Sequence, residues 1–159
     1  MDALTLALQQ SRADFEIAPQ LLESARWDDV KKLTVDLLPL LTFSGYRGES
    51  VKSRANAWLA AGEEEKSKAI AAKRTALAKS INRLEVGLYN VQTGKGKKCV
   101  KGVCAYDTED MQEATAAIIA ALDGLLPLMG CENRWQSGKC EILPKDRSGI
   151  EALVSQGVF

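Results

Sequence analysis

The chain has 159 residues, 46% of them hydrophobic and 26% charged, and its 21 basic and 21 acidic side chains give a formal net charge of zero. This length suits one main domain around a single core, and the neutral balance argues against general nucleic-acid binding, which needs a net basic surface. Histidine is absent, so the commonest general base and metal ligand are both missing, which is the strongest argument in the sequence against an enzyme.

The first part of the chain predicts two helices and a shorter helical piece. Apolar residues recur every three or four positions over residues 2–25, where Pro19 should kink or restart the helix because its ring removes a hydrogen-bond donor. We expect the second helix to begin near Trp27 and to close at Ser44–Gly45. A brief helical piece capped by Ser50 follows. Its expected apolar face consists of Val51, Ala55, Trp58 and Leu59.

The second part predicts the two longest helices. Residues 63–92 form one, ended by Gly94, and Thr108–Met129 forms the other, with Thr108 or Asp107 as its N-cap. The second of these is so apolar that it needs neighbours on most of its sides. Its apolar stretch is broken by Asp123, so we expect no membrane span. The first ten residues lack a basic region and a cleavage site, so we also expect no targeting segment.

Long helices with short connections predict an all-α fold, namely an up-down-up-down four-helix bundle with a small disulfide-stapled C-terminal extension. We expect the bundle domain over residues 1–130. The extension, residues 131–159, should hold a loop and a last short helix near Ser148–Gln156. The segment Cys99–Cys104 is the one place where a small hairpin is expected.

Four cysteines fall in connecting segments: Cys99, Cys104, Cys131 and Cys140. An even number of loop cysteines in a small domain indicates disulfides and therefore an oxidising compartment. The pairing of neighbours, 99 with 104 and 131 with 140, is favoured because each bond closes a short loop worth about 2–3 kcal/mol. A four-thiolate zinc site is the rival, but the spacings C-x4-C and C-x8-C fit it poorly, and we predict no metal site. Free thiols are the third alternative.

A lysine cluster lies between the third and fourth long helices and consists of Lys95, Lys97, Lys98 and Lys101. Interleaved glycines suggest a phosphate loop, but the G-x4-G-K-[ST] pattern is not met and no buried strand precedes it. Two interpretations remain. The cluster is either a solvated loop or an electrostatic docking patch for an acidic partner surface.

Tryptophan occurs three times. Trp27 and Trp58 lie on apolar helical faces, which predicts that both belong to the core. Trp135 lies in a polar loop, where it either plugs the end of the bundle or anchors a partner. No serine, cysteine or aspartate has a base nearby in the sequence, and the acidic pairs suit the starts of helices, so no catalytic residue is predicted.

Three runs along the predicted helices have a recognisable pattern. The run from Ala25 to Leu33, A-R-W-D-D-V-K-K-L, which continues to Asp36-Leu37, resembles the second helix of the PsbQ family, the extrinsic lumenal subunits of photosystem II. Ile81–Gly87 resembles that family's third helix, with Glu85 in place of an aspartate. Resemblance to the fourth helix rests on Tyr106, Ala114 and Leu122-Asp123-Gly124-Leu125-Leu126. The insertion Gly94–Cys104 and the C-terminal extension differ from the plant-type protein and are more similar to the PsbQ-like subunit of diatoms and related algae.

This resemblance implies a non-catalytic protein without a cofactor, located in the chloroplast thylakoid lumen and peripheral to the membrane. It would bind the photosystem II core and other extrinsic subunits, shield the oxygen-evolving centre, and help to retain calcium and chloride. An oxidising lumen agrees with disulfides, and a missing targeting segment agrees with a mature, processed chain. The alternatives are a secreted helical-bundle inhibitor, such as a pectin-methylesterase inhibitor, whose N-terminal disulfide is absent here, and a ligand-binding bundle, for which no polar anchor is evident.

Overall fold

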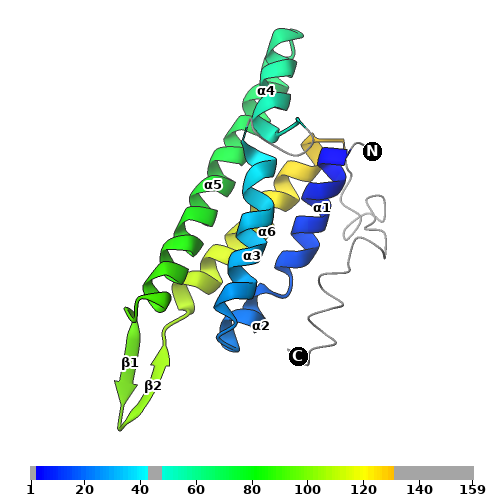
Figure 1. The fold of residues 1–159 in the computed structure, drawn as a ribbon. Coiled ribbons are helices and arrows are strands. Elements are labelled where there is room, and N and C mark those ends of the chain that lie inside the picture. Colours follow the sequence, from blue (N-terminus) through cyan, green and yellow to red (C-terminus); the bar gives the residue numbers. More distant parts are fainter. Residues whose placement is uncertain (1–2, 43–47, 131–159) are drawn as a thin grey trace.

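The computed structural model describes residues 3–42 and 48–130, and 76% of these residues are helical. Within them, six helices and one two-stranded hairpin follow one another along the chain (Figure 1). The expectation of a mostly helical protein is therefore confirmed. The extension over residues 131–159, with its expected short helix, lies outside the described residues.

The expected first helix is two helices, α1 (Ala3–Phe15) and α2 (Ala18–Glu23). The interruption falls just before Pro19, which occupies the first turn of α2, where a missing backbone N–H leaves no hydrogen bond unmade. Helix α3 (Trp27–Leu41) follows with two aspartates in its first turn, where the helix dipole stabilises negative charge. Pro39 lies near the end of α3, as its position in the sequence indicates.

Helix α4 (Val51–Ala60) begins with the cap that the sequence predicts. The Ser50 hydroxyl accepts a hydrogen bond from the Ser53 backbone N–H at 3.1 Å, and the Ser50 N–H donates to the Ser53 hydroxyl at 2.8 Å. This reciprocal pattern satisfies two backbone donors that a helix start otherwise leaves unpaired.

The structure confirms only half of the apolar face that was predicted for α4. Val51 and Ala55 are buried, but Leu59 is 54% exposed. Trp58 is half-buried against the edge of the core, with the Lys66 ammonium 5.1 Å from the centre of its ring. The reason is that α4 packs mainly along the first part of α5, and this pair extends beyond the other helices (Figure 1). Among the described helices, the last turn of α4 therefore packs on α5 without a second helix to cover it.

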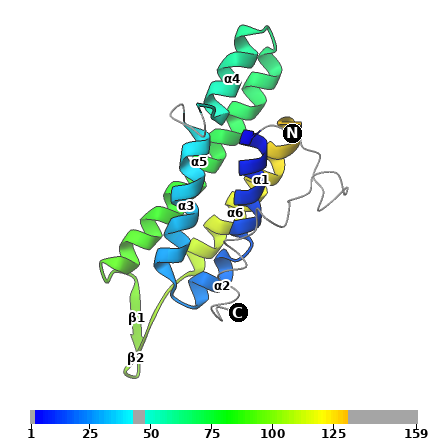
Figure 2. The same ribbon diagram turned by 45° about the vertical axis from the view of Figure 1, so that its right-hand side comes forward.

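Helix α5 (Glu64–Gln92) has 29 residues, or roughly 43 Å at 1.5 Å per residue. Strands β1 (Lys97–Val100) and β2 (Val103–Tyr106) pair antiparallel after it, and α6 (Glu109–Leu128) returns along α5 (Figures 1 and 2). The expected hairpin is thus present. The α5–α6 contact is the most extensive between helices in the described part of the chain.

The core lies inside a ring of helix contacts. Helix α1 packs on α3 and α6, α3 packs on α5, and α5 packs on α6 (Figure 2). The predicted stripe of α6, with Met111, Ala114 and Ile118 among its members, is buried as expected. Burying one aliphatic side chain contributes about 1.5–3 kcal/mol. The largest fully buried side chains are Phe15, Leu4, Leu8, Leu21, Leu22, Leu37, Leu41, Ile70, Leu77, Ile81, Leu84 and Leu88.

Helix α6 is also long and apolar enough, by length and composition, to cross a membrane. The sequence argument excluded a span because of Asp123. In the structure this carboxylate pairs with Arg12 of α1, with 2.8 Å between Arg12 Nε and Asp123 Oδ1. A core helix with one buried face passes the same test of length and composition, and the buried stripe of α6 is what the other helices pack against.

Candidate docking site

The segment over residues 95–106, called the basic hairpin below, extends from the end of the molecule where α5 stops and α6 starts (Figures 1 and 2). Every residue from Gln92 to Ala105 is exposed. The basic hairpin therefore contributes almost nothing to the core, and its shape has to be maintained by its own contacts.

A disulfide between Cys99 and Cys104 closes the basic hairpin across a directly opposed residue pair. This confirms one of the two expected bonds, whereas Cys131, Cys140 and Trp135 lie outside the described residues. An isolated two-stranded hairpin is marginally stable at best. Closing a loop this short contributes about 2 kcal/mol by the chain-entropy model, so the disulfide is the main stabilising contact of the strand pair.

The turn at the tip requires unusual backbone angles. Lys101 and Gly102 have φ values of 52° and 79°, so both central residues lie in the left-handed region, as a type I′ turn requires. Glycine adopts this conformation without steric cost, whereas a residue with a Cβ atom loses about 1–2 kcal/mol. The short turn thus holds a strained lysine at the outermost point of the hairpin.

An ion pair next to the strands neutralises one of the four lysines of the cluster. The Lys98 ammonium donates to the Asp107 carboxylate at 2.9 Å, and this contact raises the pKa of Lys98. The same contact, together with the Glu109 backbone N–H, holds the pKa of Asp107 below its ordinary value. Lys95, Lys97 and Lys101 form no ion pair with any residue in the described ranges.

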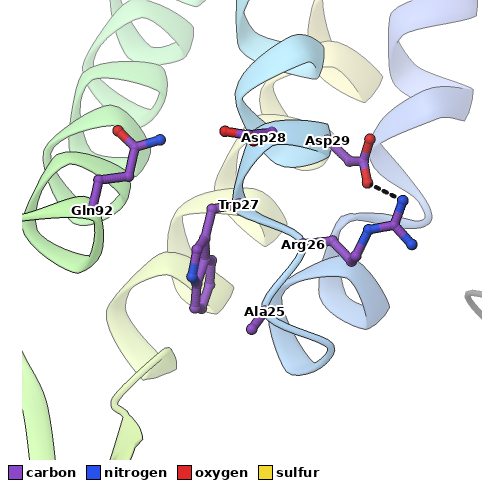
Figure 3. A pocket seen from close by; sticks show the side chains of 6 residues that line it. All are labelled: Ala25, Arg26, Trp27, Asp28, Asp29 and Gln92. Atoms are coloured by element: carbon purple, nitrogen blue, oxygen red, sulfur yellow. Dashed lines mark ion pairs between the residues drawn. The ribbon is translucent and has the colours of Figure 1, made fainter. Parts of the chain in front are cut away.

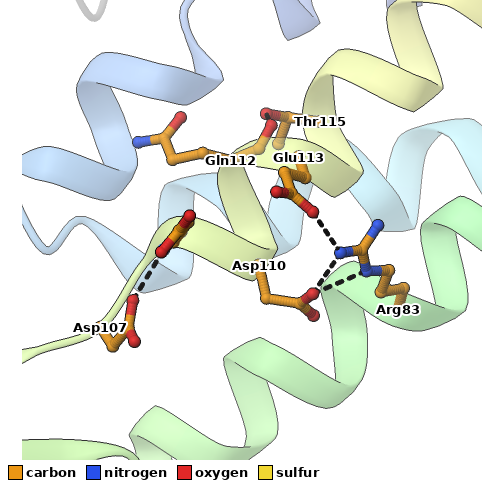
Figure 4. Close-up of polar contacts among 7 residues, drawn as sticks. Arg83, Asp107, Asp110, Gln112, Glu113 and Thr115 are labelled. Atoms are coloured by element: carbon orange, nitrogen blue, oxygen red, sulfur yellow. Dashed lines mark hydrogen bonds and ion pairs between the residues drawn. The ribbon is translucent and has the colours of Figure 1, made fainter.

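Two further acidic side chains near the hairpin are also occupied. Arg83 on α5 donates to Asp110 at 2.9 Å and to Glu113 at 2.7 Å, both on the first turns of α6 (Figure 4). Hydrogen bonding to this guanidinium lowers the pKa of Asp110. These carboxylates therefore do not compensate the three remaining lysines, and the hairpin stays locally positive although the whole chain is neutral.

Sequence reasoning missed two residues of this site. Val100 and Val103 flank the turn as a cross-strand pair and are 69% and 72% exposed. Because side chains alternate along a strand, both lie on the face opposite to Cys99 and Cys104. The signal was available in the sequence V-K-G-V, where a two-residue turn containing glycine places the flanking residues opposite each other.

An aromatic contact joins the base of the basic hairpin to the helices. The rings of Tyr106 and Trp27 meet edge to face, with centroids 5.6 Å apart and planes at 85°. Trp27, predicted to be a core residue, is half-buried and packs against the margin of the core. The hairpin is thus anchored to the start of α3.

A shallow hollow of about 260 Å³ lies beside this anchor, between the start of α3 and the end of α5 (Figure 3). Its wall includes Ala25, which has a φ of 54° and closes helix α2 in a Schellman motif. Figure 3 shows the Asp28 carboxylate extending toward α5, where Gln92 lies, with the Trp27 ring below. Arg26 and Asp29 complete the lining and pair with each other at 2.6 Å.

Two carboxylates, Asp28 and Asp29, line this hollow. None of its six lining residues is a serine, cysteine, lysine or histidine, so these aspartates are the only side chains of the lining that could act as a nucleophile or a base. In the two described ranges, no three acidic, cysteine or histidine side chains come together to hold a metal ion.

No protein-family model, curated protein or solved structure matches this chain.

Proposed function

We propose that this protein is a non-catalytic assembly subunit that docks on the acidic surface of a larger complex through its basic hairpin. The observation that carries the proposal is a disulfide-closed hairpin that projects from a helical body and bears three lysines without an ion-pair partner among the described residues. Positive charge concentrated on a neutral protein speeds and orients the encounter with a negative surface. It also makes the affinity fall as salt rises.

The body is proposed to be an up-down-up-down four-helix bundle formed by α1 with its continuation α2, then α3, α5 and α6. The closed ring of helix contacts and the short connection between α2 and α3 support this topology. Such a body is rigid enough to cover a partner surface while the hairpin positions it.

The exposed valines at the tip add an apolar component to docking. Moving both from water into a partner surface is worth about 2 kcal/mol, or roughly thirtyfold in Kd. The partner surface that fits best is therefore an apolar recess with acidic residues around its rim.

The proposed partner is photosystem II, on the lumenal side of the thylakoid membrane. The order of the PsbQ-like runs along the helices supports this assignment, and the Cys99–Cys104 disulfide agrees with an oxidising compartment. In that setting the protein would shield the oxygen-evolving centre and support calcium and chloride retention, without ligating any ion itself.

Reconstitution of salt-washed photosystem II membranes with the purified protein tests this assignment. We expect saturable binding and a partial recovery of oxygen evolution when calcium and chloride are low. An absence of binding together with unchanged oxygen evolution would refute photosystem II as the partner.

Charge reversal tests the docking surface itself. The test variant replaces lysines of the basic hairpin and is Lys95→Glu, Lys97→Glu and Lys101→Glu. The matched control, with the same change in net charge on exposed helical lysines, is Lys31→Glu, Lys32→Glu and Lys79→Glu. The hairpin variant should bind at least tenfold more weakly and lose most of its salt dependence, whereas the control should bind nearly normally. Equal weakening of both would show that total charge, not the hairpin, controls binding.

A second pair of variants tests the apolar tip. Val100→Thr combined with Val103→Thr keeps side-chain shape and strand preference but replaces one methyl group by a hydroxyl group at each position. We expect roughly tenfold weaker binding at every ionic strength. Val35→Thr is the control because Val35 is 53% exposed on the outside of α3. Unchanged binding by the double variant would show that the tip does not enter the partner.

A further inference from the structure

The Cys99–Cys104 disulfide is accessible to large reagents. Both cysteines are exposed in a sheet of only two strands, and among the described elements these strands pack chiefly on each other. Structural disulfides of secreted proteins resist reduction, whereas exposed ones are more readily reduced and serve labile or regulatory roles. The Cys99–Cys104 bond is placed like the exposed, more readily reduced disulfides.

Three lysines lie within two residues of Cys99 along the chain. Lys97 lies on the same face of the hairpin as Cys99 and Cys104, because side chains two positions apart share a face. Lys101 lies at the adjacent turn and has no ion-pair partner among residues 3–42 and 48–130. Nearby ammonium groups stabilise a thiolate, and a more stable thiolate is a better leaving group when a disulfide is attacked.

The strand pair depends on this bond. Each strand has four residues, the turn contains a strained lysine, and in the described ranges only Tyr106, at the end of β2, packs its side chain against a helix. Without the disulfide, the chain-entropy model lowers the ratio of closed to open hairpin by roughly fortyfold. The helices pack elsewhere, so opening of the hairpin leaves their core intact.

We propose that Cys99–Cys104 is a thiol–disulfide exchange site for a protein dithiol, and that its reduction unfolds the basic hairpin. A thiolate of the reductant attacks one sulfur, the S–S bond breaks, and the displaced sulfur leaves as a thiolate that takes up a proton from water. The second thiol of the reductant loses its proton and displaces the bound cysteine. Two electrons and two protons thereby pass to the hairpin, and the reductant becomes a disulfide.

The consequence for docking rests on the proposed function. Reduction would disperse the lysines and the two valines that the closed hairpin holds together, so attachment to the partner would become dependent on redox state. Exchange and unfolding are properties of the isolated chain, however, and can be measured without any partner.

The test treats the native, full-length protein with dithiothreitol as the probe dithiol, followed by alkylation and peptide mapping. We expect Cys99 and Cys104 to be alkylated while the far-ultraviolet circular dichroism keeps its helical signal. Amide hydrogen exchange in β1 and β2 should accelerate by roughly fortyfold. If dithiothreitol reduces this bond only after the protein is unfolded in urea, or if exchange in the strands is the same before and after reduction, the proposal is wrong.

Two variants sharpen the test. Cys99→Ser combined with Cys104→Ser should reproduce the fast exchange of the reduced protein and no longer respond to dithiothreitol. Lys101→Asn introduces Asn-Gly, the preferred type I′ pair, and should restore roughly fivefold of the lost protection after reduction. A serine variant that exchanges as slowly as the oxidised protein would overturn the proposed coupling between bond and fold.

Binding separates this inference from the proposed function. If reduction opens the hairpin and binding to photosystem II membranes is lost, both stand. If the hairpin opens and binding is unchanged, the exchange site stands and docking through the basic hairpin is refuted. If the protein never binds these membranes, the exchange measurements still decide the inference.

Discussion

Two glycines in the α5–α6 interface should respond oppositely to the same substitution. A Cβ atom at Gly87 would lie 2.4 Å from Cγ and 2.9 Å from Sδ of Met111, which is 2% exposed. A Cβ atom at Gly124 would lie 3.0 Å from Cε and Nζ of Lys73, the end of a flexible, exposed side chain. Met111 is enclosed by the core, whereas Lys73 can turn toward solvent.

The magnitudes follow from two opposing effects. Replacing glycine by alanine inside a helix gains about 1 kcal/mol of helix propensity. Gly124→Ala should keep most of that gain and raise the free energy of unfolding by about 0.5–1 kcal/mol. Gly87→Ala must displace a buried side chain, which costs about 1–3 kcal/mol, so it should lower the free energy of unfolding by about 1 kcal/mol.

Urea unfolding followed by circular dichroism measures both changes. The two midpoints should move in opposite directions by roughly 0.5 M, given typical denaturant slopes. Met111→Ala provides the double-mutant cycle, because removing Cγ removes the clash, and the coupling with Gly87→Ala should be favourable by about 1–2 kcal/mol. If Gly87→Ala is as stabilising as Gly124→Ala, the close packing of α6 on α5 described here is wrong.

Three further predictions concern single residues. Ala25→Gly should stabilise the protein by about 1 kcal/mol because it relieves a left-handed backbone conformation, and a lower urea midpoint would contradict this. Asp107 and Asp110 have lowered pKa values because basic neighbours donate hydrogen bonds to them. Their contribution to stability is therefore complete at neutral pH and is lost as pH falls through their folded pKa values. Carboxyl titration by NMR should give midpoints below the ordinary value of about 3.9. Asp123→Ala should cost about 1 kcal/mol in thermal unfolding, because the Arg12 side chain is only 11% exposed and would lose its partner on α6 while keeping Glu16 on α1. An unchanged midpoint would show that this pair contributes nothing.

Local signals in the sequence predicted the positions of most helices. Pro19 and Ser50 act through their own backbone and side-chain chemistry, so their effects could be inferred from single residues. The buried stripe of α6 could be inferred because period and composition define an apolar face. The exposure of Leu59 could not, since an apolar face does not indicate how far the neighbouring helices extend.

The candidate site was predicted in part. The lysine cluster and the Cys99–Cys104 bond lie within a short segment, where proximity in sequence is proximity in space. Pairing of Lys98 with Asp107 depends on strand register, and the contact of Trp27 with Tyr106 joins positions far apart in the chain. Such long-range contacts leave no local signal, so the sequence did not indicate that Lys98 pairs with Asp107, and it assigned Trp27 to the core.

The order in which the helices pair has a consequence for synthesis on the ribosome. Helices α5 and α6 are neighbours in sequence, but α1 meets α6 across more than a hundred residues, as the contact of Arg12 with Asp123 at a separation of 111 shows. Until α6 has emerged, the apolar side of α1 has only α3 to cover it, and Leu4, Leu8 and Phe15 remain partly accessible to water. The growing polypeptide therefore completes the described helical core only after α6 has been synthesised.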